Sequence, residues 1–348
     1  MNHRTRTLLA GVALACGIAV AATPPVSGAG SGAATGATHA ARVTAAAPRN
    51  GRIFFSTGFI LPQPDLSGNW QVYSVRPDGS DLEQLTHVPA GVVAGDPGVS
   101  PDGRTVAYVT NTTGAFTVWT MSRTGRHERR LLATPRTDYF LPSWSPDGKR
   151  LLLTACDTSL GFEAWCDLVT VRADGSHLRK VVADHRNNFA GHYSPNGRWI
   201  EFGSDRSGYV GAIWVIRASG GRPHRLTPPR LEAETAAWSP DGSHIAFGSN
   251  CCQPDGNIYT VTRDGGHLTK LTHAPFPHGA GWPSYSPDGR YIAFGSDMLR
   301  PEGSPKLDLF VMRADGSHVR RIESEEQPTP ILDWAPAPTA SPSEGVLP

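Results

Sequence analysis

Short apolar runs that alternate with polar positions recur along most of the chain. Residues 106–109, 245–247 and 258–261 are examples, and β-branched and aromatic side chains dominate them. This composition and alternation predict β-strands. The run at 258–261 is followed by Asp264-Gly265 and then by a short run ending in Leu-Thr, which predicts a hairpin between two strands.

A second signal sets the period of these strands. The turn sequence Ser-Pro-Asp/Asn-Gly returns every 45 to 49 residues, and weaker copies stand at 48–52 and 335–336; the clear copies begin at Ser100, Ser145, Ser194, Ser239 and Ser286. A fixed period of this length indicates a repeat architecture. Proline presets φ, Asp bonds its own backbone and Gly permits a positive φ, so we interpret the motif as a structural turn and not as a ligand site.

The units close into a ring. A further strand, carrying an aromatic residue, precedes each turn; the aromatic residues are Trp144, Tyr193, Trp238, Tyr285 and Trp334. Each unit therefore has four strands, whose two apolar faces are buried by radial stacking. The unit that starts at Arg52 lacks this strand, and 330–334 is an isolated copy of it. We predict an all-β, six-bladed β-propeller over residues 48–336, with four antiparallel strands per blade and the C-terminal strand completing the first blade.

The repeat resembles that of a known family. The copy at 238–272 reads Trp-Ser-Pro-Asp-Gly-x-x-Ile-Ala-Phe-x-Ser, followed by Ile-Tyr, Gly and Leu-Thr. It is similar to the repeat of TolB-like propellers, a WD40-like family, over roughly residues 49–336. The resemblance implies the fold. For function it implies several roles, because members act as periplasmic protein-binding scaffolds, as accessory domains of serine peptidases and in a few cases as sugar-acid lyases. We expect neither TolB's N-terminal α/β domain nor a C-terminal hydrolase domain.

The N-terminal region predicts export. Arg4 and Arg6 precede an apolar run at 8–22 with Ala-x-Ala-like cleavage options, which is typical of a signal peptide at residues 1–22. A lipobox-like segment ending at Cys16 offers lipidation as the alternative. Residues 23–47 and 337–348 are rich in small and polar residues, and we expect a disordered linker and a disordered tail. We therefore expect a secreted or periplasmic protein, tethered to a membrane only if Cys16 is lipidated.

The net charge indicates which partners to expect, and the cysteines indicate which disulfides or metal sites to expect. The formal net charge is +1 and no polybasic run is present, so we expect no nucleic-acid partner. Cys156 and Cys166 flank one loop, and an oxidising compartment favours a disulfide between them. Cys251 and Cys252 could form a vicinal disulfide or a metal site. We discount zinc because no His lies at ligand spacing.

The predicted central channel contains the candidate ligand-binding residues. Side chains of the innermost strands alternate in direction, so one position per blade should face the axis; these are Gly98, Ser143, His192, Ala237, Ser284 and Asp333. Two positions earlier stand Asp96, Leu141, Ala190, Thr235, Trp282 and Ile331. The candidates are His192, Asp333, Asp96 and Trp282, and His192 should face Asp333 across the axis. A channel-bound cation is one option, but we favour a wet channel with incidental polar groups and expect no cofactor.

Two further features of the sequence concern function, namely long loops that could contact a partner and the lack of known catalytic motifs. Phe59, Ile60, Leu61 and Trp165 lie in loops at one end of the blades and could bind a partner or fold back on their own blades. No Gly-x-Ser-x-Gly and no His-Glu-x-x-His appears in the propeller region. We therefore predict a non-catalytic scaffold that binds a protein or another cell-envelope component. The alternative is a propeller-type polysaccharide lyase or hydrolase with a polar or metal site in the channel.

Overall fold

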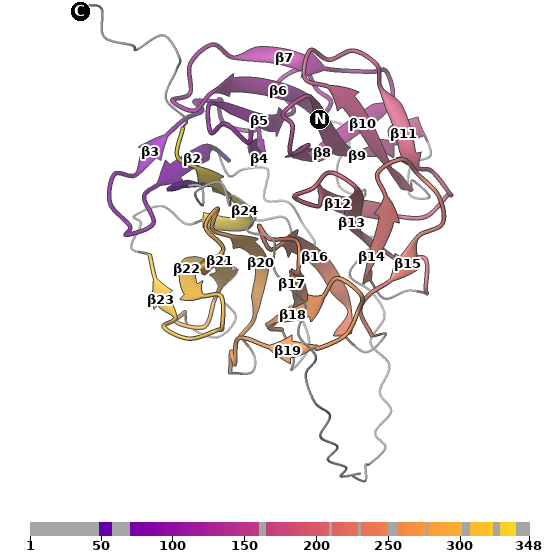
Figure 1. Cartoon of the computed structure of the whole chain (residues 1–348). Helices are drawn as coiled ribbons and strands as arrows, with labels where there is room; N and C mark the ends of the chain where they lie inside the picture. The colour runs from indigo at the N-terminus through magenta and orange to yellow at the C-terminus, as the bar shows by residue number, and fades with distance from the viewer. Residues whose placement is uncertain are drawn as a thin grey trace, which may run out of the picture.

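Six four-stranded antiparallel sheets are arranged around a central axis in the computed structural model (Figure 1). The structure describes residues 49–57, 70–159, 165–208, 211–228, 231–249, 256–275, 278–300, 307–322 and 328–338. The predicted all-β six-bladed propeller is confirmed. Among the described residues, no helix has the length and apolar character that crossing a membrane would require.

Each blade runs from an innermost strand at the channel to an outermost strand at the rim. Blade 1 consists of β24 (Pro328–Pro336), β1 (Asn50–Thr57), β2 (Val72–Val75) and β3 (Glu83–Gln84). Blade 2 consists of β4 (Ala94–Val99), β5 (Thr105–Thr110), β6 (Thr117–Ser122) and β7 (Arg129–Leu132). Blade 3 consists of β8 (Thr137–Trp144), β9 (Arg150–Asp157), β10 (Cys166–Arg172) and β11 (Arg179–Val182).

The other three blades follow the same order. Blade 4 consists of β12 (Asn188–Tyr193), β13 (Trp199–Ser204), β14 (Ala212–Arg217) and β15 (His224–Arg225). Blade 5 consists of β16 (Ala233–Trp238), β17 (His244–Ser249), β18 (Ile258–Thr262) and β19 (Thr269–Lys270). Blade 6 consists of β20 (Ala280–Tyr285), β21 (Tyr291–Ser296), β22 (Asp308–Arg313) and β23 (Arg320–Arg321).

The C-terminal strand closes the ring as predicted. On β24, Trp334 pairs with Ile53 of β1 in an antiparallel register. Trp334 packs with Val311 of blade 6 in one apolar cluster, and Ala335 packs with Val106 of blade 2 in another. The last strand therefore joins the cores on both sides of blade 1, because its two faces contact two different neighbours.

The repeated turn has the structural role that the sequence predicts. In blade 2, the Ser100 hydroxyl donates to Asp102 Oδ1 at 2.6 Å and accepts from the backbone N–H of Thr105 at 2.9 Å. The same pair of bonds recurs at Ser145, Ser194, Ser239 and Ser286. Each turn satisfies its polar groups internally and joins an innermost strand to the next strand of its blade.

The predicted disulfide is also present. Cys156 and Cys166 are directly opposite each other on β9 and β10, with their Cα atoms 4.2 Å apart. The signal peptide, the linker, Cys16, Cys251, Cys252 and the tail beyond residue 338 lie outside the described residues, so these expectations stay predictions. The same holds for the loop residues Phe59, Ile60 and Leu61.

Candidate functional site

The innermost strands share an irregularity that shapes the channel wall. Register shifts interrupt the pairing of β4, β8, β12, β16 and β20 with the second strand of each blade. At this point Asp96, Leu141, Ala190 and Trp282 have φ between +51° and +54°, in the left-handed region. Non-glycine residues adopt this conformation at a cost, and such outliers gather at binding sites. Asp96 and Trp282, two of the candidates, therefore stand at strained positions.

Two carboxylates of the innermost strands connect blade 1 to blade 2 and blade 2 to blade 3. Asp333 Oδ2 accepts a hydrogen bond from the backbone N–H of Val99 at 2.7 Å, so blade 1 is bound to blade 2. Asp96 Oδ2 accepts from the N–H of Leu141 at 3.0 Å, which binds blade 2 to blade 3. These two carboxylates thus satisfy backbone donors and also carry charge into the wall of the channel.

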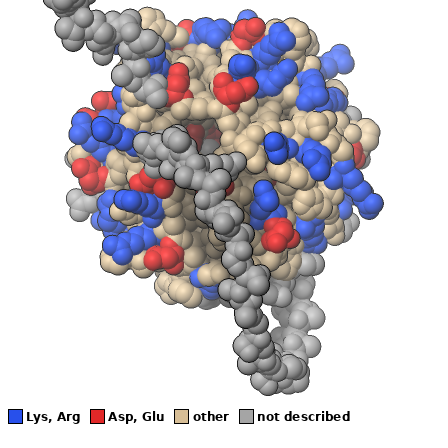
Figure 2. All heavy atoms as spheres, in the orientation of Figure 1, with Lys and Arg blue, Asp and Glu red and all other residues tan. Residues whose placement is uncertain are grey.

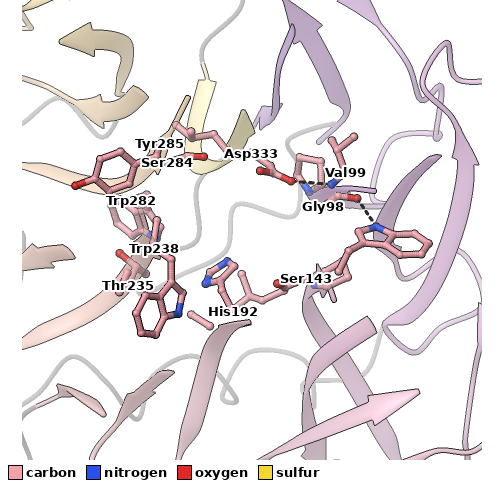
Figure 3. Close-up of a pocket in the computed structure, with 18 of the residues that line it drawn as sticks. Gly98, Val99, Ser143, His192, Thr235, Trp238, Trp282, Ser284, Tyr285 and Asp333 are labelled. Carbon is pink, nitrogen blue, oxygen red and sulfur yellow. Dashed lines mark hydrogen bonds between the residues drawn. The ribbon is translucent and has the colours of Figure 1, made fainter. Parts of the chain in front are cut away.

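A cavity of about 270 Å³ occupies the centre of the ring, and all four channel candidates line it. His192 of β12 and Asp333 of β24 project into it from opposite sides, three blades apart (Figure 3). Trp282 lies on the wall together with Trp238 and the other residues drawn in the figure. The structure therefore places the candidates where the alternation predicts them, in one cavity with polar and aromatic walls.

Glu201 is the residue that the sequence prediction missed. Its side chain is fully buried, and its Oε1 lies 2.9 Å from Nδ1 of His192. Its Oε2 is buried without a hydrogen-bond partner among the described residues. The imidazole of His192 is 44% exposed toward the cavity. Glu201 thus orients a ring whose other nitrogen remains on the channel side.

The sequence does contain a signal for Glu201. In the pairing of first and second strands, the positions equivalent to Glu201 are all apolar: Phe54, Ala107, Leu152, Ala246 and Ala293. A carboxylate at a position that is otherwise apolar in every blade breaks the repeat pattern. Comparison of the six repeats position by position would have identified it.

The acidic groups of the channel are held away from their usual pKa. Burial raises the pKa of Asp96 to about 6, although the N–H of Leu141 opposes this shift. Burial likewise raises the pKa of Asp333, against the N–H of Val99 and the imidazole of His192. Burial also raises the pKa of Glu201, against the charge and the hydrogen bond of His192. Each carboxyl group is therefore less acidic than it would be in solvent.

The imidazole shifts toward its charged form. Burial in the channel wall lowers the pKa of His192, but the hydrogen-bonded Glu201 and the facing Asp333 outweigh this effect and raise the pKa. The cavity therefore combines one imidazole that favours a proton with the carboxyl groups of Asp96 and Asp333, while Glu201 contacts the imidazole from outside the lining. Among the described residues, no group of three or more His, Cys, Asp or Glu side chains is arranged to hold a metal ion.

Trp165, the described member of the predicted partner-binding loops, lies apart from the cavity lining. Its indole packs edge-on against His185, with ring centroids 4.5 Å apart. Trp165 is only partly exposed. His185 lies between β11 of blade 3 and β12 of blade 4, and the partner-binding role of Trp165 stays a prediction.

Comparisons with known proteins agree with this architecture. Residues 97–250 match the family model of the TolB beta propeller domain. The Tol-Pal system protein TolB of Anaeromyxobacter dehalogenans is 29% identical over 157 residues, 44% of this chain and 34% of that protein. An uncharacterised protein of Agrobacterium fabrum is 31% identical over 139 residues, 40% of this chain and 45% of that protein. The match thus spans less than half the length of these two relatives.

A solved structure extends the likeness to most of the propeller. TolB from Acinetobacter baumannii superposes with a TM-score of 0.65 at 21% identity, covering 82% of this chain and 67% of that one. At this level of identity the likeness concerns the fold.

Proposed function

Because the chain is a TolB-like six-bladed β-propeller, we propose that it is a non-catalytic binding scaffold of the cell envelope that holds a protein partner at the mouth of its channel. The relatives include Tol-Pal system proteins, and residues 1–22 have the pattern of an export signal. Both support an envelope location. The position of the site is supported by the cavity itself, which gathers acidic and aromatic side chains at strained backbone positions.

The chemistry of the cavity indicates what the partner inserts. Asp96 and Asp333 line the cavity together with a single imidazole, and Glu201 is buried behind that imidazole, so the wall is acidic near neutral pH even though burial raises the pKa of each carboxyl group. Trp238 and Trp282 add aromatic surface to the same wall. A cavity lined by carboxylates and indole rings suits a cationic side chain, through ion pairing and cation–π contact. In this proposal the partner presents a Lys or Arg side chain to Asp333.

The test is capture of the partner with conservative variants. The full chain and its Asp333→Asn variant are used to capture proteins from envelope extracts of the producing cell, and captured proteins are identified by mass spectrometry. Asn can still accept from the Val99 N–H, so the blades stay connected. We expect one captured protein, the partner, to bind Asp333→Asn about tenfold more weakly than it binds the wild type, which corresponds to about 1.4 kcal/mol. Arg263→Gln on the outer edge of blade 5 is the control, and equal capture by the wild type and both variants would overturn the proposal.

One observation favours a second candidate function. A buried Glu201 that orients His192 toward a cavity is also an arrangement that general acid–base catalysis uses. The second candidate is therefore the lyase or hydrolase activity on a polysaccharide. Turnover of acidic and neutral polysaccharides by the full chain, abolished in His192→Gln, would replace the scaffold proposal with this one.

A further inference from the structure

Basic residues are distributed unevenly around the outer rim of the propeller, although the net charge of the chain is close to zero. We define the basic arc as the described residues of 122–136, 172–187, 217–228 and 231–232, which form the outer edges of blades 2, 3 and 4. The arc contains 12 Arg and Lys residues against 4 Asp and Glu residues. The equivalent described residues of blades 5, 6 and 1 (262–275, 278–279, 313–322 and 76–93) contain 6 against 5.

The arc is continuous across the blade junctions. A side-chain nitrogen of Arg129 in blade 2 donates to the carbonyl of Ala173 in blade 3, and one of Arg179 in blade 3 donates to the carbonyl of Ala218 in blade 4. Figure 2 shows Lys and Arg along the upper and right-hand side of the molecule, where β7, β11, β14 and β15 lie in Figure 1, and further Lys and Arg on the left-hand side. Three separate stretches of sequence therefore form one surface.

Most of this charge is free to act on a partner. All the cations of the arc are exposed except Arg123 and Arg225, which are partly exposed. Within the described part of the chain, Lys180 is the one cation of the arc that forms an ion pair, with Asp167 at 2.8 Å, and the arc residue Asp184 pairs with Arg206 outside the arc. Unpaired surface cations over three blades create a positive potential that extends about a Debye length into solvent, roughly 8 Å at physiological salt.

Protection of edge strands against aggregation does not account for the arc. Lys and Arg on edge strands commonly prevent strand addition. However, the edge strand β3 carries Glu83 and Gln84 and no cation, so edge protection in this fold does not require basic residues. Many cations of the arc also lie outside the edge strands, for example Arg126, Arg172 and Arg222.

We propose that the basic arc binds an anionic phospholipid surface. Eleven of its 12 cations are Arg, whose planar fork suits phosphate oxygens. The arc follows the outer circumference of the ring, while the cavity described above belongs to the channel, so the arc suits an extended array of phosphates. Leu178 is 41% exposed in the middle blade of the arc, beside Arg179. An apolar side chain among cations can enter the lipid interface, which favours lipid over a dissolved polyanion.

This inference does not depend on the channel function, and vesicle binding tests it. The full chain is mixed with vesicles of phosphatidylcholine alone or with an equal part of phosphatidylglycerol, and bound protein is measured by flotation. The measured quantity is the ratio of the two partition coefficients, because binding through the apolar run at 8–22 should contribute to both. We expect a clear preference for the anionic vesicles that is lost at high salt.

Matched charge reversals locate the surface. The triple variant Arg130→Glu, Arg172→Glu and Arg222→Glu changes one cation in each blade of the arc, and we expect the ratio to fall on the order of 100-fold, since each cation near an anionic surface contributes about fivefold. The control triple variant Arg263→Glu, Arg290→Glu and Arg313→Glu changes the net charge equally on blades 5 and 6 and should keep most of the ratio. Circular dichroism checks folding, and Gln replaces Glu at the same positions if a variant fails to fold.

The remaining outcomes are decisive as well. Leu178→Ser should lower binding to anionic vesicles severalfold while leaving binding to soluble polyphosphate unchanged. Equal losses in both triple variants would mean that general charge and not the arc is responsible, and would overturn the proposal. Binding to polyphosphate or to DNA without binding to anionic vesicles would also overturn it, in favour of a polyanion partner.

Discussion

Blades 4 and 5 present the same backbone to the channel with opposite chemistry. His192 and Glu201 are directly opposite each other on β12 and β13, and Ala237 and Ala246 hold the same positions on β16 and β17. Both second-strand residues are fully buried. The repeat therefore fixes where a side chain stands, and it leaves open whether that side chain is a methyl group or a carboxylate.

The difference is energetic as well as chemical. A buried alanine leaves no polar group unsatisfied, whereas a buried carboxylate is unfavourable unless it is paired. Glu201 has one paired oxygen and one buried oxygen without a partner among the described residues. Blade 4 thus carries a destabilising group that the fold, as blade 5 demonstrates, does not require. Such a group is a candidate for function on physical grounds.

Removing the imidazole that pairs with Glu201 should have the largest effect on the free energy of unfolding. In His192→Ala the buried Glu201 loses its partner, and we expect the free energy of unfolding at pH 8 to fall by about 3 kcal/mol, near the lower end of the range for a broken buried pair because the imidazole is partly exposed. Urea unfolding measures this effect. Ser143→Ala, the equivalent change in blade 3, should cost less than about 1 kcal/mol.

The same variant has a predicted pH dependence. Burial raises the pKa of Glu201 in the folded state, and loss of the imidazole removes the groups that oppose this shift. An acid whose pKa is raised by folding holds its proton more tightly in the folded state, so stability declines as pH rises from the unfolded pKa to the folded pKa. The stability of His192→Ala itself should therefore decline between pH 4 and pH 8, because Glu201 ionises without a partner in this interval. A stability that stays constant over this interval would show that cavity formation and not charge is responsible for the loss.

The contrast between these blades also shows what the sequence could predict. The turn period and the alternation were sufficient for six blades, for the closure by Trp334 and for the placement of His192 opposite Asp333, because these follow from backbone geometry that every repeat shares. Glu201 was missed because it lies inside a strand that otherwise reads as apolar. Its role depends on a cross-strand contact within one blade, and a reading of each strand separately does not reveal it.

Charge provides the second example of what could not be predicted. The sequence has a net charge of +1 and no basic run, so it gave no indication of a basic surface. The cations of the arc lie in three separate stretches of the chain, one in each blade, and these stretches come together only because the outer edges of consecutive blades are neighbours. A surface of this kind depends on topology, and the average charge of the chain carries no information about it.

Asp96 differs from Glu201 because it is a buried carboxylate without an imidazole beside it. Its pKa is raised to about 6 by burial, and it is only 4% exposed. In Asp96→Asn the amide oxygen can still accept from the Leu141 N–H, and the cost of burying a charge disappears. We expect the variant to be more stable than the wild type at pH 7.5 by about 2 kcal/mol, somewhat less than the full value of a shift of this size.

The pH profile separates this explanation from a gain in packing. The folded pKa of Asp96 lies above the unfolded value, so its unfavourable contribution is absent below about pH 4 and complete above about pH 6. The stabilisation by Asn should therefore appear across this interval and be lost at pH 4. Thermal unfolding at several pH values measures it, and a variant that is destabilised at pH 7.5 would contradict the prediction.

Replacing both residues of the His192–Glu201 pair with their counterparts from blade 3 should change the free energy of unfolding least. Blade 3 carries Ser143 and Leu152 at the two positions, so His192→Ser with Glu201→Leu copies a pair that this fold already accommodates. Replacing a buried ion pair with an apolar residue of similar volume is often neutral, so the double variant should lie within about 1 kcal/mol of the wild type although His192→Ala alone is costly. Equal destabilisation of the single and the double variant in urea would mean that blade 4 depends on the imidazole for packing. Recovery of stability together with loss of partner capture would assign the pair to binding, because the propeller would then be intact without it.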